Sequence, residues 1–122
     1  MVMAEIRCSN KYDKEHKRSE MAVLVFTRDD SLIVKISGPV DTSEAELLRD
    51  ELNKVIKLRP QKVVMDLSLV PSMGSSGIGK ILFFFKGLDG LGSQFEVRGI
   101  HKNLYGVFKA VKLDKLFPIS LR

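Results

Sequence analysis

Residues 62–82 read KVVMDLSLVPSMGSSGIGKIL, a short apolar run followed by a glycine- and serine-rich loop and a second apolar pattern. The run at 62–68 has the length of a strand and does not alternate with polar residues. We therefore expect it to be buried on both faces, at the centre of a parallel or mixed sheet. Beyond the loop, apolar residues at i, i+3, i+4 and i+7 predict an amphipathic helix, which glycines 87, 90 and 92 end. Its apolar stripe comprises Ile78, Ile81, Leu82, Phe85 and Leu88.

Two strands and a helix are predicted before this stretch. AVLVFT (22–27) and SLIVKISG (31–38) are apolar, β-branched runs, and the short polar connection between them suits a hairpin. Pro39 breaks the second run, and Thr42 or Ser43 can cap a helix with an acidic first turn. The apolar stripe of this helix is predicted at Leu48, Leu52, Val55 and Leu58.

The residues after the second helix predict a further strand, helix and strand. QFEVRGI (94–100) has strand character, and LFPI (116–119) can close the sheet as a short final strand. A helix at about 102–112 places Leu104, Val107, Phe108 and Val111 on one face. The order ββαβαβα(β) predicts one α/β domain over 21–122, with a mixed sheet of about four to five strands packed with three to four helices. Residues 1–20 are predicted to be a flexible charged extension, because they offer little apolar surface to bury.

The composition limits the possible classes of protein. A chain of 122 residues, 44% hydrophobic and 29% charged, forms one globular domain without room for accessory lobes. One cysteine, Cys8, and two histidines, His16 and His101, do not make a convincing metal site. No apolar run approaches the ~20 residues that span a bilayer, and the N-terminus lacks the features of a signal peptide. We therefore expect a cytoplasmic protein that does not insert into membranes.

The net charge of +5 raises the question of a nucleic-acid partner. Lys102, Lys109, Lys112 and Lys115 are spread through an amphipathic stretch without interleaved aromatic residues. This pattern is typical of a solvated helix face rather than of a nucleic-acid footprint. We expect no nucleic-acid partner, and an acidic protein partner remains an alternative.

The loop at 74–80 also resembles a nucleotide-binding P-loop in part. Gly74, Gly79 and Lys80 have the required spacing, but Ile81 stands where a serine or threonine would ligate magnesium. Ile78 already falls in the apolar helical period, whereas a P-loop must stay open around the phosphates. A P-loop-like nucleotide binder is therefore the least favoured hypothesis.

Four pieces of the chain, in the right order, resemble the STAS domain of bacterial anti-sigma factor antagonists. They are Gly38–Asp41, matching Gly-x-x-Asp; the strand around Asp66; MGSSGIGKIL (73–82), matching Met/Ile-Asp-Ser-Ser-Gly-Leu-Gly; and VKLDKLF (111–117). The resemblance runs from about 21 to 119. It implies a STAS fold and a binding module rather than an enzyme, without a cofactor. The chain departs from the family at Gly74, where an aspartate is usual.

The resemblance also implies a partner-switching cycle in the control of transcription. In the family the second serine of Ser-Ser-Gly accepts a phosphate, and the match assigns this role to Ser76. The unphosphorylated chain would bind an anti-sigma factor or related serine kinase, phosphorylation would end that binding, and a PP2C-type phosphatase would restore it. The chain would be a monomer or a weak dimer. Alternatively, it is an adaptor subunit of a stress-sensing or lipid-transport complex, in which Gly74 reflects the loss of phosphorylation control.

The physical setting of Ser76 is compatible with a switch. A phosphate at the start of a helix meets free backbone N–H groups and the positive end of the helix dipole, although either serine can equally be a plain helix cap. Phe83 lies about 200° around the helix from Ile81, so we expect it to be exposed and available as an interface anchor, with Phe84 at the margin. The predicted switch and partner-binding surface comprises Asp41, Gly74, Ser75, Ser76, Gly77, Lys80 and Phe83.

Overall fold

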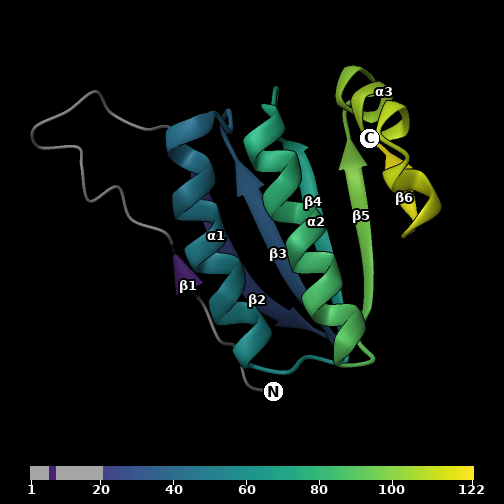
Figure 1. Cartoon of the computed structure of the whole chain (residues 1–122). Coiled ribbons are helices and arrows are strands. Elements are labelled where there is room, and N and C mark those ends of the chain that lie inside the picture. The colour runs from purple at the N-terminus through teal and green to yellow at the C-terminus, as the bar shows by residue number, and fades with distance from the viewer. Residues whose placement is uncertain (1–5, 8–20) are drawn as a thin grey trace, which may run out of the picture.

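The computed structural model describes residues 6–7 and 21–122, and in this part of the chain six strands form one sheet (Figure 1). β1 (Ile6–Arg7) pairs antiparallel with β2 (Ala22–Arg28). β2 forms the predicted hairpin with β3 (Ser31–Ser37), and Asp29 takes a left-handed conformation, φ 55°, in the turn. Apart from β1, residues 1–20 lie outside the described residues, so the flexible extension stays a prediction.

Helices and parallel strands alternate in the rest of the chain. The elements are α1 (Thr42–Lys57), β4 (Lys62–Leu69), α2 (Ser75–Gly90), β5 (Gln94–Ile100), α3 (Lys102–Ala110), the 3₁₀ turn η1 (Leu113–Lys115) and β6 (Ile119–Leu121). β3, β4, β5 and β6 run parallel to one another. This arrangement confirms the predicted α/β fold with a mixed sheet.

The order of the strands across the sheet, β1-β2-β3-β4-β5-β6, is their order in the chain. Each parallel pair is therefore joined by a crossover through a helix. Right-handed crossovers that all step in the same direction place their helices on the same face of a sheet. Figure 1 shows α1 and α2 side by side over this face, where they contact each other, while α3 lies at the β5 and β6 end.

The hydrophobic core fills the space between this face and the helices. Val34, Met65 and Val97 of the three central strands are fully buried, as are Leu48 of α1 and Ile81 of α2. Val64 and Ile33 are also buried but lie outside the main cluster, because neighbouring side chains of a strand point to opposite faces. The expectation that β4 is central and buried on both faces is confirmed at these positions.

Three of the predicted core positions are exposed. Leu58 and Val111 follow the last residues of α1 and α3, where the chain leaves helical geometry, and they are 51% and 53% exposed. Val107 is 43% exposed, because Leu104 and Phe108 supply the buried residues of the short helix α3.

The buried stripe of α2 also differs from the prediction. Phe84, expected at the margin, is 2% exposed, and its ring meets that of Phe95 edge-on at 5.5 Å. Phe85 is only partly buried, with its ring 5.2 Å from that of Phe117. Gly87 lies where α2 approaches α1, since a Cβ there would lie 2.8 Å from Cδ1 of Ile56. The absence of a side chain thus permits the close approach of the two helices.

Element boundaries in two places differ from the sequence-based expectation. The N-cap of α1 is Asp41 rather than Thr42 or Ser43. The final strand begins at Ile119 instead of Leu116, because η1 and the following residues are still turning and Pro118 has no N–H for a ladder.

Glu96 lies between two cationic side chains on the sheet face opposite α1 and α2. Its carboxylate oxygens are 3.3 Å from Nζ of Lys62 and 3.1 Å from a guanidinium nitrogen of Arg98. Partial burial raises the pKa of Glu96, but the hydrogen bonds from Arg98 and Lys62 outweigh this effect. The pKa of the carboxyl group is therefore below its ordinary value.

We expect Glu96→Gln to reduce stability at neutral pH and to have less effect in acid. A carboxyl group whose pKa is lowered by folding stabilises the native state above its unfolded pKa, and this contribution is lost as the pH falls through the folded pKa. Urea unfolding of both proteins, from pH 7 down to about pH 3, measures the difference in unfolding free energy. A difference that does not change with pH would contradict the assigned role of the carboxylate.

Candidate functional site

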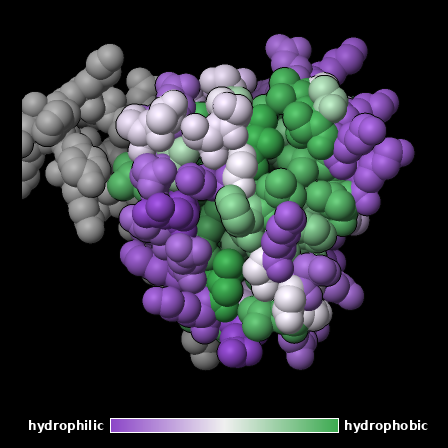
Figure 2. Space-filling model, viewed as in Figure 1, coloured by the Kyte–Doolittle hydropathy of each residue, from purple (hydrophilic) through white to green (hydrophobic). Residues whose placement is uncertain are grey.

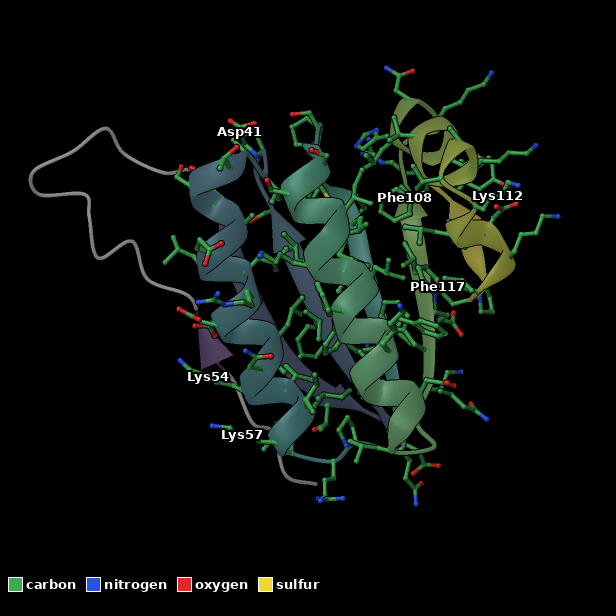
Figure 3. The ribbon with its side chains drawn as sticks, viewed as in Figure 1. Asp41, Lys54, Lys57, Phe108, Lys112 and Phe117 are labelled. Atoms are coloured by element: carbon green, nitrogen blue, oxygen red, sulfur yellow. The ribbon has the colours of Figure 1, made fainter. Side chains whose placement is uncertain are left out.

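The starts of α1 and α2 lie next to each other at one end of the sheet. Backbone hydrogen bonds hold them there: the N–H of Val40 donates to the carbonyl of Ser72 at 3.0 Å, and the N–H of Gly74 donates to the carbonyl of Val40 at 2.9 Å. Asp41 directly follows Val40 and caps α1, while Gly74 caps α2. Figure 3 shows Asp41 at this end of α1. We call Asp41, Gly74, Ser75 and Ser76 the helix-start surface.

The two helices begin with different caps. The N–H of Asp41 donates to the carboxylate of Glu44 at 3.1 Å, as in a capping box. Gly74, in contrast, has no side chain that could accept a hydrogen bond from the first turn of α2, and that turn contains no acidic residue. The start of α2 therefore presents backbone donors and a positive dipole end that its own cap does not satisfy.

Ser75 and Ser76 are the first two residues of α2. Ser75 is exposed, whereas Ser76 is half-buried. Phosphorylation of Ser76 stays a prediction, and the more accessible of the two hydroxyls is that of Ser75.

Gly77 belongs to the predicted surface, but the structure buries it. A Cβ at this position would lie 2.8 Å from Cγ of Met73 and 2.8 Å from Cγ1 of Val40. Such distances are shorter than van der Waals contact, so any side chain here must displace its neighbours. Gly77 therefore allows the first turn of α2 to pack closely against Met73 and Val40, which pair through their backbones. This close packing helps to position the helix-start surface.

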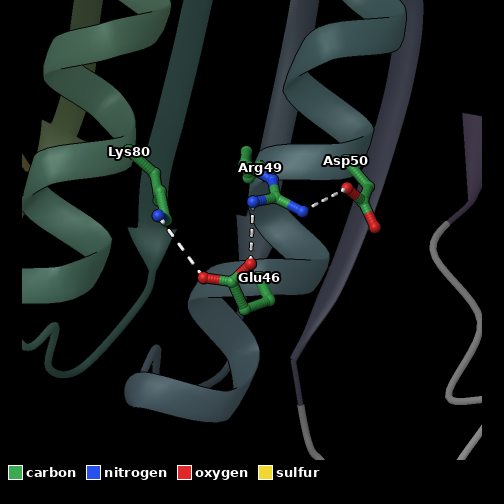
Figure 4. A network of polar contacts seen from close by, with 4 residues as sticks. All are labelled: Glu46, Arg49, Asp50 and Lys80. Carbon is green, nitrogen blue, oxygen red and sulfur yellow. Dashed lines mark hydrogen bonds and ion pairs between the residues drawn. The ribbon is translucent and has the colours of Figure 1, made fainter.

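Lys80 joins α2 to α1 through an ion pair (Figure 4). Its Nζ is 3.4 Å from a carboxylate oxygen of Glu46, and the other oxygen of Glu46 is 2.9 Å from Arg49, which also contacts Asp50. Glu46 and Arg49 are not among the predicted site residues. Their i, i+3 spacing in the sequence is the available signal, but the contact with Lys80 depends on how the two helices pack.

The same geometry does not support a P-loop. α2 begins at Ser75, so Gly79 and Lys80 lie within the helix and cannot form a wide loop around phosphates. Within the described ranges, no group of three or more histidine, cysteine, aspartate or glutamate residues could hold a metal ion. The same residues contain no helix that is both long and apolar enough to cross a membrane.

Phe83 is exposed, as predicted, with 72% of its surface accessible. It lies seven residues after Ser76, which corresponds to about 10 Å along the helix axis. In Figure 2, apolar residues gather over α2 and the part of the surface beside it, whereas hydrophilic residues cover α1. The outer face of α2 therefore extends the helix-start surface with an apolar region.

The STAS domain family model matches residues 22–122. This match includes all of the sheet except β1, together with the helix-start surface. The chain belongs to the STAS domain family.

Its relatives include anti-sigma factor antagonists. An anti-sigma F factor antagonist of Paenibacillus polymyxa is 28% identical over 89 residues, 72% of this chain and 76% of that protein. The crystal structure of an anti-sigma factor antagonist from Mycobacterium paratuberculosis has 27% identity and a TM-score of 0.76, over 83% of this chain and 86% of that one. A putative anti-sigma factor antagonist from Thermotoga maritima has 20% identity and a TM-score of 0.75, over 80% and 85% of the two chains, and shows the shared fold.

Proposed function

We propose that this chain is a partner-switching regulator that binds an anti-sigma factor with serine kinase activity through the helix-start surface. The observation that carries the proposal is a pair of serines at the start of α2, beside the start of α1 and without an acidic neighbour at the cap. The similarity to anti-sigma factor antagonists supports the class of partner. Phosphorylation of the serine pair would end the binding, and a PP2C-type phosphatase would reverse it.

A phosphate at this position is compatible with the fold. It would add about −1.5 to −2 charges close to free backbone N–H groups and the positive end of α2, which favour an anion. Lys80 lies one helical turn after Ser76, where its charge is already paired with Glu46. The domain would therefore stay folded, and the new charge would act on the partner through repulsion and the cost of removing the phosphate from water.

The resemblance assigns the phosphate to Ser76, and accessibility makes Ser75 the competing acceptor. We expect incubation with the kinase partner and ATP to add one phosphate to the chain, and treatment with a PP2C-type phosphatase to remove it. Mass spectrometry of the phosphorylated peptide, with Ser75→Ala and Ser76→Ala as paired variants, locates the site. A phosphate on Ser75 would correct the assignment to Ser76 and leave the switch intact. No incorporation by a kinase that forms a stable complex with the chain would contradict phosphorylation control.

Gly74 favours a second candidate, an adaptor whose helix-start surface binds its partner constitutively. A glycine cap removes the aspartate that the family usually has beside its phosphoserine site, and with it a side chain that a kinase would recognise. Gly74 has open space around it, since a Cβ added there would have the carbonyl oxygen of Val40 as its nearest atom, at 3.9 Å. Gly74→Asp can therefore be made without a clash. A large gain in phosphorylation in this variant would favour the adaptor for the native chain.

A further inference from the structure

The C-terminal segment, residues 102–122, carries most of the net charge of the protein. It contains one acidic residue, Asp114, and five basic residues, so its net charge of 5 − 1 = +4 compares with +5 for the whole chain. The basic residues are Lys102, Lys109, Lys112, Lys115 and Arg122, all of them exposed. Among the residues that the structure describes, none of these five side chains forms an ion pair with a carboxylate. The net positive charge of the segment is therefore not paired with carboxylates of the described residues.

Exposed apolar side chains are concentrated in the same segment. Of the eight large apolar side chains that are exposed in the described part of the chain, four belong to it. They are Val107 (43%), Val111 (53%), Leu116 (46%) and Leu121 (51%). We call the exposed side chains of residues 102–122 the C-terminal surface. Exposed apolar side chains with polar or charged neighbours can mark a site of protein interaction.

The C-terminal surface is held firmly by the rest of the domain. Leu104, Phe108, Leu113 and Phe117 anchor the segment in the core, each no more than 4% exposed. Before α3, Nε2 of His101 lies 3.0 Å from the carbonyl of Ser68, at the end of β4. Figure 3 shows Phe108 and Phe117 directed toward β5, and Lys112 directed away from the domain. The surface is therefore formed before any partner binds, which limits the entropy lost on binding.

We propose that the C-terminal surface is a second docking site, which takes an acidic, amphipathic segment of a protein partner. Charge complementarity defines the partner: carboxylates would pair with the exposed lysines, and apolar side chains would cover Val107 and Val111. The proposal does not depend on the proposed switch, because it uses neither the helix-start surface nor phosphorylation.

The exposed groups favour a protein over other anionic partners. Binding of single-stranded nucleic acid relies on aromatic side chains that stack on bases, but Phe108 and Phe117 are buried here, and Tyr105 packs, partly buried, against the core. A helix that lies in a membrane interface turns its large apolar side chains toward the lipid, whereas α3 is nine residues long and turns Leu104 and Phe108 into the core. The remaining exposed side chains, valines and leucines beside lysines, suit an acidic peptide.

The test uses a synthetic peptide with leucines at i, i+3, i+4 and i+7 and glutamates elsewhere, and the full chain labelled with nitrogen-15. We expect the peptide to shift amide signals within 102–122. The double variant Lys109→Glu and Lys112→Glu should weaken binding by about ten-fold or more, with an effect that falls as salt is added. The matched control, Lys57→Glu and Arg59→Glu, makes the same change of charge at exposed positions at the end of α1 and should alter binding by less than about two-fold. Val107→Ser with Val111→Ser tests the apolar part and should also weaken binding.

Three results would overturn the proposal. The first is that the peptide shifts amide signals of residues outside 102–122. The second is that the control variant loses as much binding affinity as the variant of Lys109 and Lys112. The third is tighter binding, through the same residues, to vesicles of phosphatidylglycerol and phosphatidylcholine or to single-stranded DNA than to the peptide. Circular dichroism and thermal unfolding of each variant show whether the fold is intact. Normal docking of the peptide together with a failed phosphorylation assay would separate this site from the helix-start surface.

Discussion

Phe84→Ala is expected to lower the free energy of unfolding by about 3–5 kcal/mol, whereas Phe83→Ala should change it by less than about 0.5 kcal/mol. The two rings are neighbours in sequence but differ in environment. Phe84 is 2% exposed and packs edge-on against Phe95, so its removal leaves a cavity between α2 and the sheet. Phe83 is 72% exposed, and most of its surface remains in water in the native state. Because a domain of this size is stable by about 5–15 kcal/mol, Phe84→Ala should remain folded at low temperature but with a small margin.

Urea unfolding monitored by circular dichroism measures both values, and each phenylalanine serves as the control for the other. Equal losses of unfolding free energy in the two variants would contradict the assignment of Phe84 to the buried face of α2 and of Phe83 to the exposed face. For binding to the proposed anti-sigma partner we expect the opposite order of effects. Phe83→Ala should weaken it, since an exposed aromatic side chain beside the helix-start surface is a typical interface anchor.

Ser76→Asp is expected to weaken binding to the proposed anti-sigma partner by at least about 1–2 kcal/mol, or roughly ten-fold. The carboxylate would be placed within the proposed contact surface, where a partner would have to remove it from water. At the start of α2 the same charge is favourable to the helix, so the stability of the domain should not fall. Ser76→Ala removes only the hydroxyl and should retain the partner.

The same two substitutions at Ser75 form the matched control. Surface plasmon resonance with the partner immobilised gives the four dissociation constants, and circular dichroism verifies the fold of each variant. A greater loss for Ser75→Asp than for Ser76→Asp would transfer the switch to the exposed serine. If both aspartate variants bind as tightly as the parent chain, the helix-start surface is not a switch, and the constitutive adaptor is the better account.

The element order is predictable because the periodic patterns are long and separated by strong turn signals. The apolar run around β4 and the helical spacing in α2 predict their elements almost to the residue. The rotation of α2 is not predictable in the same way. Ile81 and Leu88 fit stripes through either Phe84 or Phe85, and only the packing of α2 in the folded domain decides that Phe84 is the buried one. A helical pattern gives the apolar face only to within about one residue on either side.

The candidate site is predictable in its residue types but not in its contacts. Ser75 and Ser76 are expected at a helix start, and the chain has them there. The burial of Gly77 depends on Val40, a residue from another loop, and the pair between Lys80 and Glu46 joins two different helices. Such contacts arise from tertiary packing, and no local pattern in a single sequence predicts them. The exposure of Val107 illustrates the same limit, since a helix of nine residues needs only two large side chains to attach it to the core.

The spatial order of the strands in the sheet is also the order in which the ribosome synthesises them. Each strand from β2 onward pairs with the strand that precedes it in the chain, so no strand has to be inserted between two others that have already paired. A nascent chain can thus extend its sheet by one strand and one helical crossover at a time. The C-terminal segment with β6 joins last, at an edge that is already built.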